Sequence, residues 1–349
     1  MKDKQPLFPL NAKASEKTMK KPEEITDFYD LGPSMILDAV ETLGFKADGS
    51  LLALNSYENR VYRIGIEDAA PLVVKFYRPQ RWSDAMIQEE HDFAQELADV
   101  EIPIVAPLLD AEGKSLHFHA GHRFAVFPCL GGRTPELSGG DDYVLMGRFI
   151  GRIHNVGRLR PFVERPTVNI DSYARESYQY VLEEGFIPSE LELPYRSLVE
   201  DILPILDSSY QQAGKIENIR LHGDCHASNI LWTDTGPHFV DLDDCRTGPA
   251  VQDLWMLLNG SRQDMTMQIA DLLDGYTEFS DFEPRELHLV EALRTMRLLY
   301  YSAWLARRWD DPAFPRSFPW FNTNRYWEEQ ILSLREQFAS LQEPALVWN

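Results

Sequence analysis

The sequence predicts an α+β protein with two unequal lobes, a small one built on an antiparallel sheet and a larger one that is mainly helical. Three observations carry this prediction. Short β-like runs are concentrated between residues 51 and 130, helical periodicity dominates from about residue 141 onward, and Pro128 with Gly131-Gly132 interrupts the chain between these regions. We therefore expect a disordered basic tail over 1–22, a small lobe over 23–130 and a large lobe over 131–349.

The elements of the predicted small lobe follow one another closely. Six lysines and scattered prolines without apolar periodicity favour disorder in the tail. A short helix is expected over 33–44, where Ser34 can cap an apolar stripe that Gly44 ends. Four β-like runs are expected at 51–57, 59–66, 71–79 and 117–130, with one helix from near Ser83 to Val100 inserted after the third.

Helical signals dominate the predicted large lobe, with one interruption. Apolar residues recur at helical spacing over 141–157, 170–213 and 286–309, and a β-like stretch at 219–245 breaks the series. The last helix carries several arginines that we expect to be exposed or ion-paired, with a grip on a phosphate or an acidic substrate as the alternative. These are Arg294, Arg297, Arg307 and Arg308.

The composition excludes several classes of protein. Of the 349 residues, 34 are Lys or Arg and 55 are Asp or Glu, so the formal net charge is −21. Such a balance argues against nucleic-acid binding, which needs clustered Lys and Arg. No apolar run approaches the roughly 20 residues that span a bilayer. Three cysteines are an odd and sparse set, which favours a reducing compartment. We expect a cytoplasmic monomer without nucleic-acid or membrane partners.

The most informative polar residues lie in the β-like stretch. Asp224 ends the run His222-Gly223-Asp224, Asn229 follows five residues later, and Asp241 comes twelve residues after Asn229 on a strand-like segment. One carboxylate on such a loop can accept a proton from a hydroxyl, while an amide oxygen and a second carboxylate hold a divalent ion. These hard oxygen ligands suit Mg²⁺ bound together with substrate phosphates. The set predicts phosphoryl transfer with Asp224 as the proton acceptor.

Two other interpretations use the same residues. Aspartate and asparagine are common in turns for purely structural reasons. A zinc site is the second alternative, because His222, Asp224, Cys225 and His226 lie close together in the sequence. Gly223 and the loop context disfavour the helical ligand spacing that such a site would use. The D-x₄-N spacing before a strand-borne aspartate favours phosphoryl transfer over both alternatives.

A kinase also needs a cation at the nucleotide phosphates, and Lys75 in the β-branched run 73–76 is the candidate. A lysine in mid-strand usually lies on a solvated face, but here an acidic helix follows. At helical spacing Glu90 falls within the apolar stripe of that helix, where a buried carboxylate needs a cationic partner. Glu89 lies at the edge of the stripe. We predict that Lys75 pairs with Glu90, with Glu89 as the alternative.

Together these residues resemble the aminoglycoside phosphotransferase-like kinase superfamily, whose motifs look like LHGDCHASN, FVDLDD, VVKFY and the EEHDF helix here. The resemblance implies a two-lobed protein-kinase-like fold, ATP as co-substrate and Mg²⁺ as cofactor. Within the superfamily it is strongest to bacterial serine/threonine protein kinases of the envelope or oxidative stress response, which implies a protein substrate with a Ser/Thr acceptor. A kinase of small hydroxylated molecules, of the aminoglycoside, choline or homoserine type, is the alternative. A nucleotide-binding pseudokinase is a third.

The resemblance also implies roles for individual residues. Asp253 would brace the catalytic loop. The remaining roles are catalytic for Asp224 and Asp241, metal-binding for Asn229 and Asp241, and nucleotide-binding for Ser56, Lys75 and Glu90.

The sequence departs from the pattern of protein kinases in two ways. It has no glycine-rich phosphate loop, so the loop around Ser56 would bind phosphate through side chains and backbone N–H groups. Only eleven residues separate Asp241 from Asp253, which leaves no room for a long activation loop.

Two further groups of residues have ordinary explanations. We expect His117, His119 and His122 on a solvated sheet edge rather than in a metal site. Cys225 and Cys245 lie near the predicted catalytic and metal-binding aspartates, so their oxidation is a possible switch, but buried thiols are usually inert.

Overall fold

The structure, a computed structural model, describes residues 28, 30–234 and 236–348. The predicted tail over 1–22 lies outside them. The described residues form two compact units. The first comprises the residues up to Arg133 together with Leu231–Asp243, and the second comprises Thr134–Ile230 and the chain from Asp244 onward. The sequence did not predict that 231–243 belongs with the first unit. The expected boundaries after residues 22 and 130 stay predictions.

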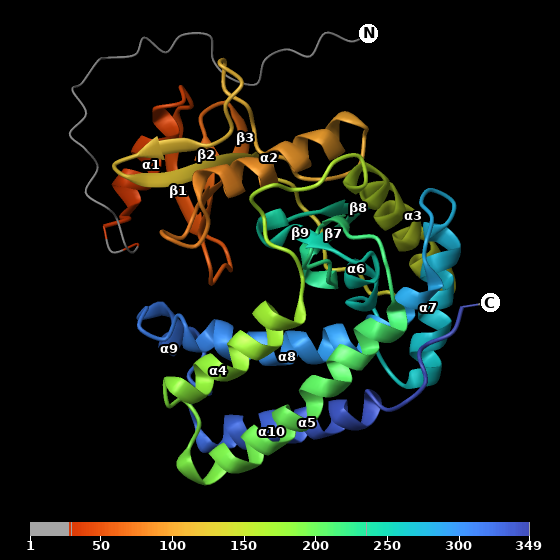
Figure 1. The fold of residues 1–349 in the computed structure, drawn as a ribbon. Coiled ribbons are helices and arrows are strands. Elements are labelled where there is room, and N and C mark those ends of the chain that lie inside the picture. The colour runs from red at the N-terminus through yellow and green to blue at the C-terminus, as the bar shows by residue number, and fades with distance from the viewer. Residues whose placement is uncertain (1–27, 29, 235, 349) are drawn as a thin grey trace. The chain divides into compact units, whose positions relative to one another are not determined.

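A five-stranded antiparallel sheet in the order β1-β2-β3-β5-β4 is the centre of the first unit (Figure 1). Val74 and Phe76 of β3 face a core shared with helix α1, so Lys75 between them points to the other face. Helix α2 follows β3, and Ser83 caps it by accepting a hydrogen bond from the Met86 N–H at 3.1 Å. The predicted sheet with one helix after its third strand is confirmed. The elements are α1 (Pro33–Glu41), β1 (Ala47–Ala53), β2 (Arg60–Ile66), β3 (Ala69–Phe76), α2 (Asp84–Asp99), β4 (His117–His119) and β5 (His122–Pro128).

Two of the three histidines at the end of this sheet are buried, so the expected solvated edge is wrong. The His122 ring stacks on Phe28 at 6.2 Å between centroids and meets Phe76 edge-on at 6.3 Å. The His117 ring tilts against Phe124 at 5.5 Å. Aromatic side chains therefore cover this edge of the sheet and exclude water from the imidazoles.

The segment 231–243 joins the first unit through backbone hydrogen bonds. Trp232 and Arg133 exchange two, at 2.7 and 3.0 Å, and Phe239 donates to Pro103 at 2.8 Å and accepts from Val105 at 3.0 Å. Strands β7 (Ile230–Thr233) and β8 (Gly236–Phe239) form a two-stranded sheet. A Cβ at Gly132 would lie 2.7 Å from that of Leu231, so a glycine is needed for this approach. These contacts fix the strand that leads into Asp241.

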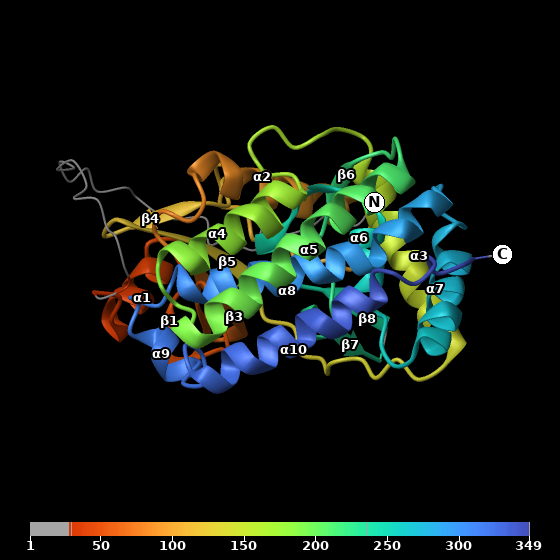
Figure 2. The same ribbon diagram turned by 60° about the horizontal axis from the view of Figure 1, so that its bottom comes forward.

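The second unit is mainly helical, as predicted. Helices α3 and α7 pack closely, because a Cβ at Gly147 would overlap the carbonyl oxygen of Leu272. Helices α4, α5, α8 and α10 lie side by side in both ribbon views (Figures 1 and 2). The bounds are α3 (Gly140–Gly157), α4 (Glu176–Glu183), α5 (Ser189–Ala213), β6 (Ile219–Leu221), β9 (Arg246–Gly248), α6 (Val251–Trp255), α7 (Arg262–Tyr276), α8 (Val290–Ala306), α9 (Ala313–Ser317) and α10 (Asn324–Ser340).

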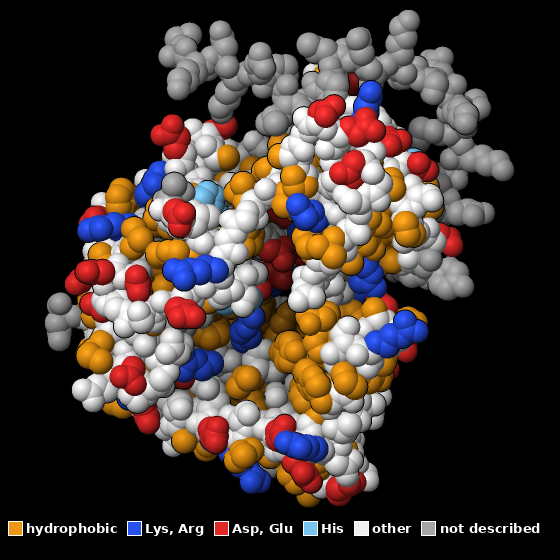
Figure 3. All heavy atoms as spheres, turned by 180° about the vertical axis from the view of Figure 1, so that it is seen from behind, with side chains coloured by type: hydrophobic (Ala, Val, Ile, Leu, Met, Phe, Trp, Pro, Cys, Tyr) orange, Lys and Arg blue, Asp and Glu red, His pale blue; other side chains and the backbone are white. Residues whose placement is uncertain are grey.

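On the face seen in Figure 3, acidic, basic and hydrophobic side chains are interspersed over the described residues.

Among the described residues, no helix is both long enough and apolar enough to traverse a bilayer.

Candidate active site

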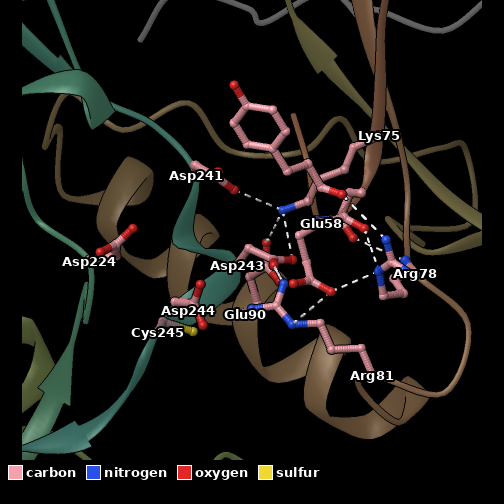
Figure 4. A network of polar contacts seen from close by, with 12 residues as sticks. Glu58, Lys75, Arg78, Arg81, Glu90, Asp224, Asp241, Asp243, Asp244 and Cys245 are labelled. Atoms are coloured by element: carbon pink, nitrogen blue, oxygen red, sulfur yellow. Dashed lines mark hydrogen bonds and ion pairs between the residues drawn. The ribbon is translucent and has the colours of Figure 1, made fainter. Parts of the chain in front are cut away.

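Lys75 is the centre of a cluster of carboxylates in the first unit (Figure 4). Its Nζ lies 3.0 Å from Asp243 Oδ1, 3.1 Å from Asp241 Oδ1 and 3.3 Å from Glu90 Oε1. The structure thus pairs Lys75 with Glu90, which is buried on α2, and not with the half-buried Glu89. It also adds Asp243, which the sequence analysis did not single out.

The electrostatics of this cluster keep Lys75 charged. Burial alone would lower the pKa of Lys75, but the charges of Asp243, Glu90 and Asp241 outweigh burial and raise that pKa well above its usual value. Lys75 and Glu90 are almost fully buried, whereas the side chain of Asp241 is 54% exposed. Asp241 is therefore the member of the cluster that solvent, or a ligand, can reach.

A second set of ion pairs connects Lys75 to the loop between β1 and β2, where the structure places Ser56. Asp243 also pairs with Arg81, and Arg81 lies 3.7 Å from Glu58 in that loop. Arg78 Nε contacts the same Glu58 carboxylate at 2.9 Å (Figure 4). Sequence reasoning missed these residues. The one available signal was that Asp243 falls within FVDLDD, one of the motifs that carry the family resemblance.

Asp241 has a backbone φ of +60°, in the left-handed region that favours glycine. For other residues this conformation costs on the order of 1 kcal/mol, and such strain is concentrated at functional sites. The hydrogen bonds of segment 231–243 hold the strand that precedes it. In this conformation the Asp241 carboxylate accepts a hydrogen bond from Lys75 at 3.1 Å.

In the second unit, the loop after β6 is held by a buried aspartate. Asp253 Oδ2 accepts a hydrogen bond from the His222 N–H and Oδ1 accepts one from the Gly223 N–H, both at 2.8 Å. His154 Nε2 lies 3.0 Å from the same carboxylate. Gly223 has a φ of +82°, and a Cβ there would overlap the carbonyl oxygen of Asp244. This geometry fits the bracing role implied for Asp253.

Glu286 holds the start of α6, the helix that carries Asp253, and its ionisation should weaken the fold. Its Oε2 accepts a hydrogen bond from the Val251 N–H at 2.9 Å, and burial raises the pKa of Glu286 to about 7. The folded protein then holds a proton that the unfolded chain releases near pH 4.5, so stability falls between these values as the pH rises.

We expect Glu286→Gln to raise the free energy of unfolding at pH 8 by about 3 kcal/mol relative to the parent protein, and by almost nothing at pH 4.5. Urea unfolding at both pH values measures this difference. The exposed Glu328→Gln is the control and should change neither value. An equal effect of Glu286→Gln at both values would contradict the prediction.

Asp224 lies at the end of the braced loop with both carboxylate oxygens engaged. Its Oδ1 accepts a hydrogen bond from Arg297 on α8 at 2.6 Å. His226 Nε2 lies 3.3 Å from Oδ2, and Asn229 Nδ2 donates to the Asp224 carbonyl oxygen at 3.0 Å. The structure therefore brings Asp224 and Asn229 together. The sequence predicted that Arg297 is exposed or ion-paired, but it did not predict that Asp224 is its partner.

Burial alone would raise the pKa of Asp224, but the His226 hydrogen bond and the Arg297 charge outweigh it and hold the pKa below its usual value. His226 Nδ1 accepts a hydrogen bond from the Ser228 N–H at 3.2 Å, which assigns the proton of the neutral ring to Nε2, facing Asp224. Asp224 is thus ionised at neutral pH.

The oxygen donors fit a divalent ion bound with a nucleotide better than a closed protein site. Among the described residues, no group of three or more His, Cys, Asp and Glu side chains is arranged to hold a metal ion. Neither a zinc site nor an all-protein cage is formed there. An exposed carboxylate such as that of Asp241 is a ligand that Mg²⁺ accepts when phosphates and water complete its shell.

Cys225 and Cys245 are both buried, and burial raises the pKa of the Cys225 thiol well above its usual value. Reactive cysteines have lowered pKa values. Cys225 therefore resembles an inert core thiol more than a redox switch.

Comparisons with known proteins identify the family and the relatives of this chain. Residues 50–290 match the family described as the phosphotransferase enzyme family. The chain is 46% identical over 319 residues to Stress response kinase A of Escherichia coli strain K12 and, equally, to Serine/threonine protein kinase RdoA of Salmonella typhimurium, covering 91% of this chain and 96% of each relative.

Among solved structures, the fold is similar to that of amicoumacin kinase hAmiN in complex with AMP-PNP, Ca²⁺ and Ami. The TM-score is 0.69 at 17% identity, over 90% of this chain and 95% of that one. At this identity the likeness shows the fold alone. It agrees with the two-lobed, kinase-like α+β fold expected from the sequence.

Proposed function

Since this chain belongs to the phosphotransferase enzyme family, we propose that it transfers the γ-phosphoryl group of ATP to a serine or threonine hydroxyl of a protein substrate, with Mg²⁺ as cofactor. The observation that carries the proposal is Asp224, an ionised carboxylate on a loop that Asp253 fixes, with Asn229 beside it. The names of its relatives support a protein acceptor.

In the proposed reaction, Asp224 accepts the proton of the acceptor hydroxyl while the hydroxyl oxygen attacks the γ-phosphorus. The bond from that phosphorus to the bridging oxygen breaks, and ADP leaves. Lys75, oriented by Glu90, binds the nucleotide phosphates, and Ser56 with the neighbouring backbone N–H groups covers them. Asn229 and Asp241 would hold Mg²⁺, which when bound would neutralise developing phosphate charge.

In the test, the purified protein is incubated with labelled ATP, Mg²⁺ and a mixture of generic proteins. A parallel reaction replaces the proteins by a panel of amino alcohols and aminoglycosides. We expect label on protein Ser/Thr, lost on addition of EDTA and restored by excess Mg²⁺. Label on small molecules alone would replace the proposal by the small-molecule kinase alternative. Nucleotide binding without any transfer would favour a pseudokinase.

We also propose that the protein acts in the cytoplasm in the response to envelope or oxidative stress, because its relatives are named for a stress response. Loss of the gene should lower survival under oxidants or envelope-damaging agents, and a plasmid copy should restore it. Unchanged survival under both treatments would count against this role.

A further inference from the structure

We propose that Arg297 selects the acceptor by binding a carboxylate or phosphate group close to the acceptor hydroxyl, so that the enzyme prefers anionic acceptors. This inference rests on the proposed function, because it takes Asp224 as the proton acceptor.

The first argument is the charge at Asp224. Arg297 donates to Asp224 Oδ1 at 2.6 Å, and in the described part of the chain Asp224 is the carboxylate with which Arg297 forms an ion pair. A cationic acceptor such as an amino alcohol would find the aspartate already neutralised and would be repelled by the guanidinium. An anionic acceptor meets an attractive charge instead.

The second argument is that Arg297 is available to a ligand while its neighbours are not. Its side chain is 42% exposed. Arg246 is almost fully buried and pairs with Asp244 at 2.6 Å. Arg294, one turn earlier on α8, lies over the Trp255 ring at 5.6 Å and 3.4 Å from Glu291. Arg297 is therefore the cation on this part of α8 that a ligand can reach beside Asp224.

The third argument is the geometry of the guanidinium. It is planar and carries five N–H donors, so one edge can hold Asp224 while another binds a second oxyanion. An acceptor with its hydroxyl at Asp224 and its anionic group at Arg297 would be held at two points. A serine peptide with neighbouring acidic residues and a small hydroxy acid both have this chemistry.

The experiment compares four acceptors at saturating ATP and Mg²⁺. They are a serine peptide flanked by glutamates, the same peptide flanked by lysines, glycerate and ethanolamine. The proteins are the parent, Arg297→Ala, Arg297→Lys and the control Arg148→Ala. Arg148 matches Arg297 in exposure, at 44%, and pairs with Glu278 at 2.7 Å. Binding of the glutamate peptide without nucleotide is measured in parallel by fluorescence anisotropy.

We expect the parent to prefer an anionic acceptor. A preference for the glutamate peptide would indicate that the anionic group belongs to a protein, and a preference for glycerate would indicate a small hydroxy acid. Arg297→Ala should lower kcat/KM for that acceptor by about 10- to 100-fold, mainly through KM, and should raise it for the lysine peptide, which the guanidinium no longer repels. Arg297→Lys should retain part of the preference, and Arg148→Ala all of it.

Three results would overturn the proposal. They are a parent preference for the lysine peptide or ethanolamine, a preference that survives in Arg297→Ala, and an equal loss of kcat for every acceptor without a change in KM. If the parent phosphorylated nothing, the proposed function would fail, but the inference would still be decided by binding. The glutamate peptide would then have to bind more weakly to Arg297→Ala than to the parent.

Discussion

Replacing Asp224 by Asn is expected to lower kcat for phosphoryl transfer by roughly 10²- to 10⁴-fold, the usual effect of removing a general base. The amide keeps the size of the side chain but cannot accept the hydroxyl proton. Because Lys75, Glu90 and Asp241 are unchanged, ATP should bind with similar affinity. Single-turnover transfer from labelled ATP and a separate nucleotide-binding titration distinguish these two effects.

Glu278→Gln is the matched control, because it removes another carboxylate that an arginine holds in the second unit. It should leave kcat unchanged. If Asp224→Asn kept more than half of the parent kcat, another group would have to accept the proton. Weak residual turnover would not contradict the prediction, since substrate positioning and the charges around the phosphates still act.

Replacing Lys75 by Met should have the largest effect on stability of any single change at the site. Glu90 and Asp243 are buried and would lose their shared cation, while Asp243 would keep its ion pair with Arg81. Removing one partner of a buried ion pair costs about 3–5 kcal/mol, because the remaining charge is left uncompensated. We expect that loss in urea unfolding at pH 7.5, together with weaker ATP binding.

The penalty should shrink at acid pH, where protonation of the buried carboxylates removes negative charge that Lys75 no longer balances. Lys114→Met is the control. Lys114 also contacts a carboxylate, Glu112 at 2.7 Å, but both side chains are exposed, so the change should be close to neutral. Equal penalties for Lys75→Met at pH 7.5 and pH 5 would show that the loss comes from packing rather than from charge.

The parts of the structure that the sequence predicted depend on local patterns. Short β-like runs marked the strands of the first sheet, and the helical period placed Glu90 on the buried face of α2, where Lys75 meets it. Both signals arise within a few residues of chain, because strand and helix geometry fix which side chains share a face.

The parts that could not be predicted depend on contacts between distant segments. Arg297 and Asp224 are 73 residues apart, and Arg81 and Asp243 are 162 apart. An arginine on an amphipathic helix has the same local pattern whether it faces solvent or a functional carboxylate. His117 and His122 were wrongly expected at a solvated edge for the same reason, because the aromatic rings that cover them come partly from other segments.

The return of segment 231–243 to the first unit has a consequence for how the protein is made. A ribosome releases the sheet strands β1 to β5 about a hundred residues before it releases the hairpin that contacts Pro103, Val105 and Arg133. During that interval the nascent first unit lacks the hairpin that pairs with it. Of the three carboxylates described around it, Lys75 then has only Glu90 as a partner, because Asp241 and Asp243 have not yet been synthesised. Completion of the first unit is thereby tied to synthesis of the chain beyond residue 243.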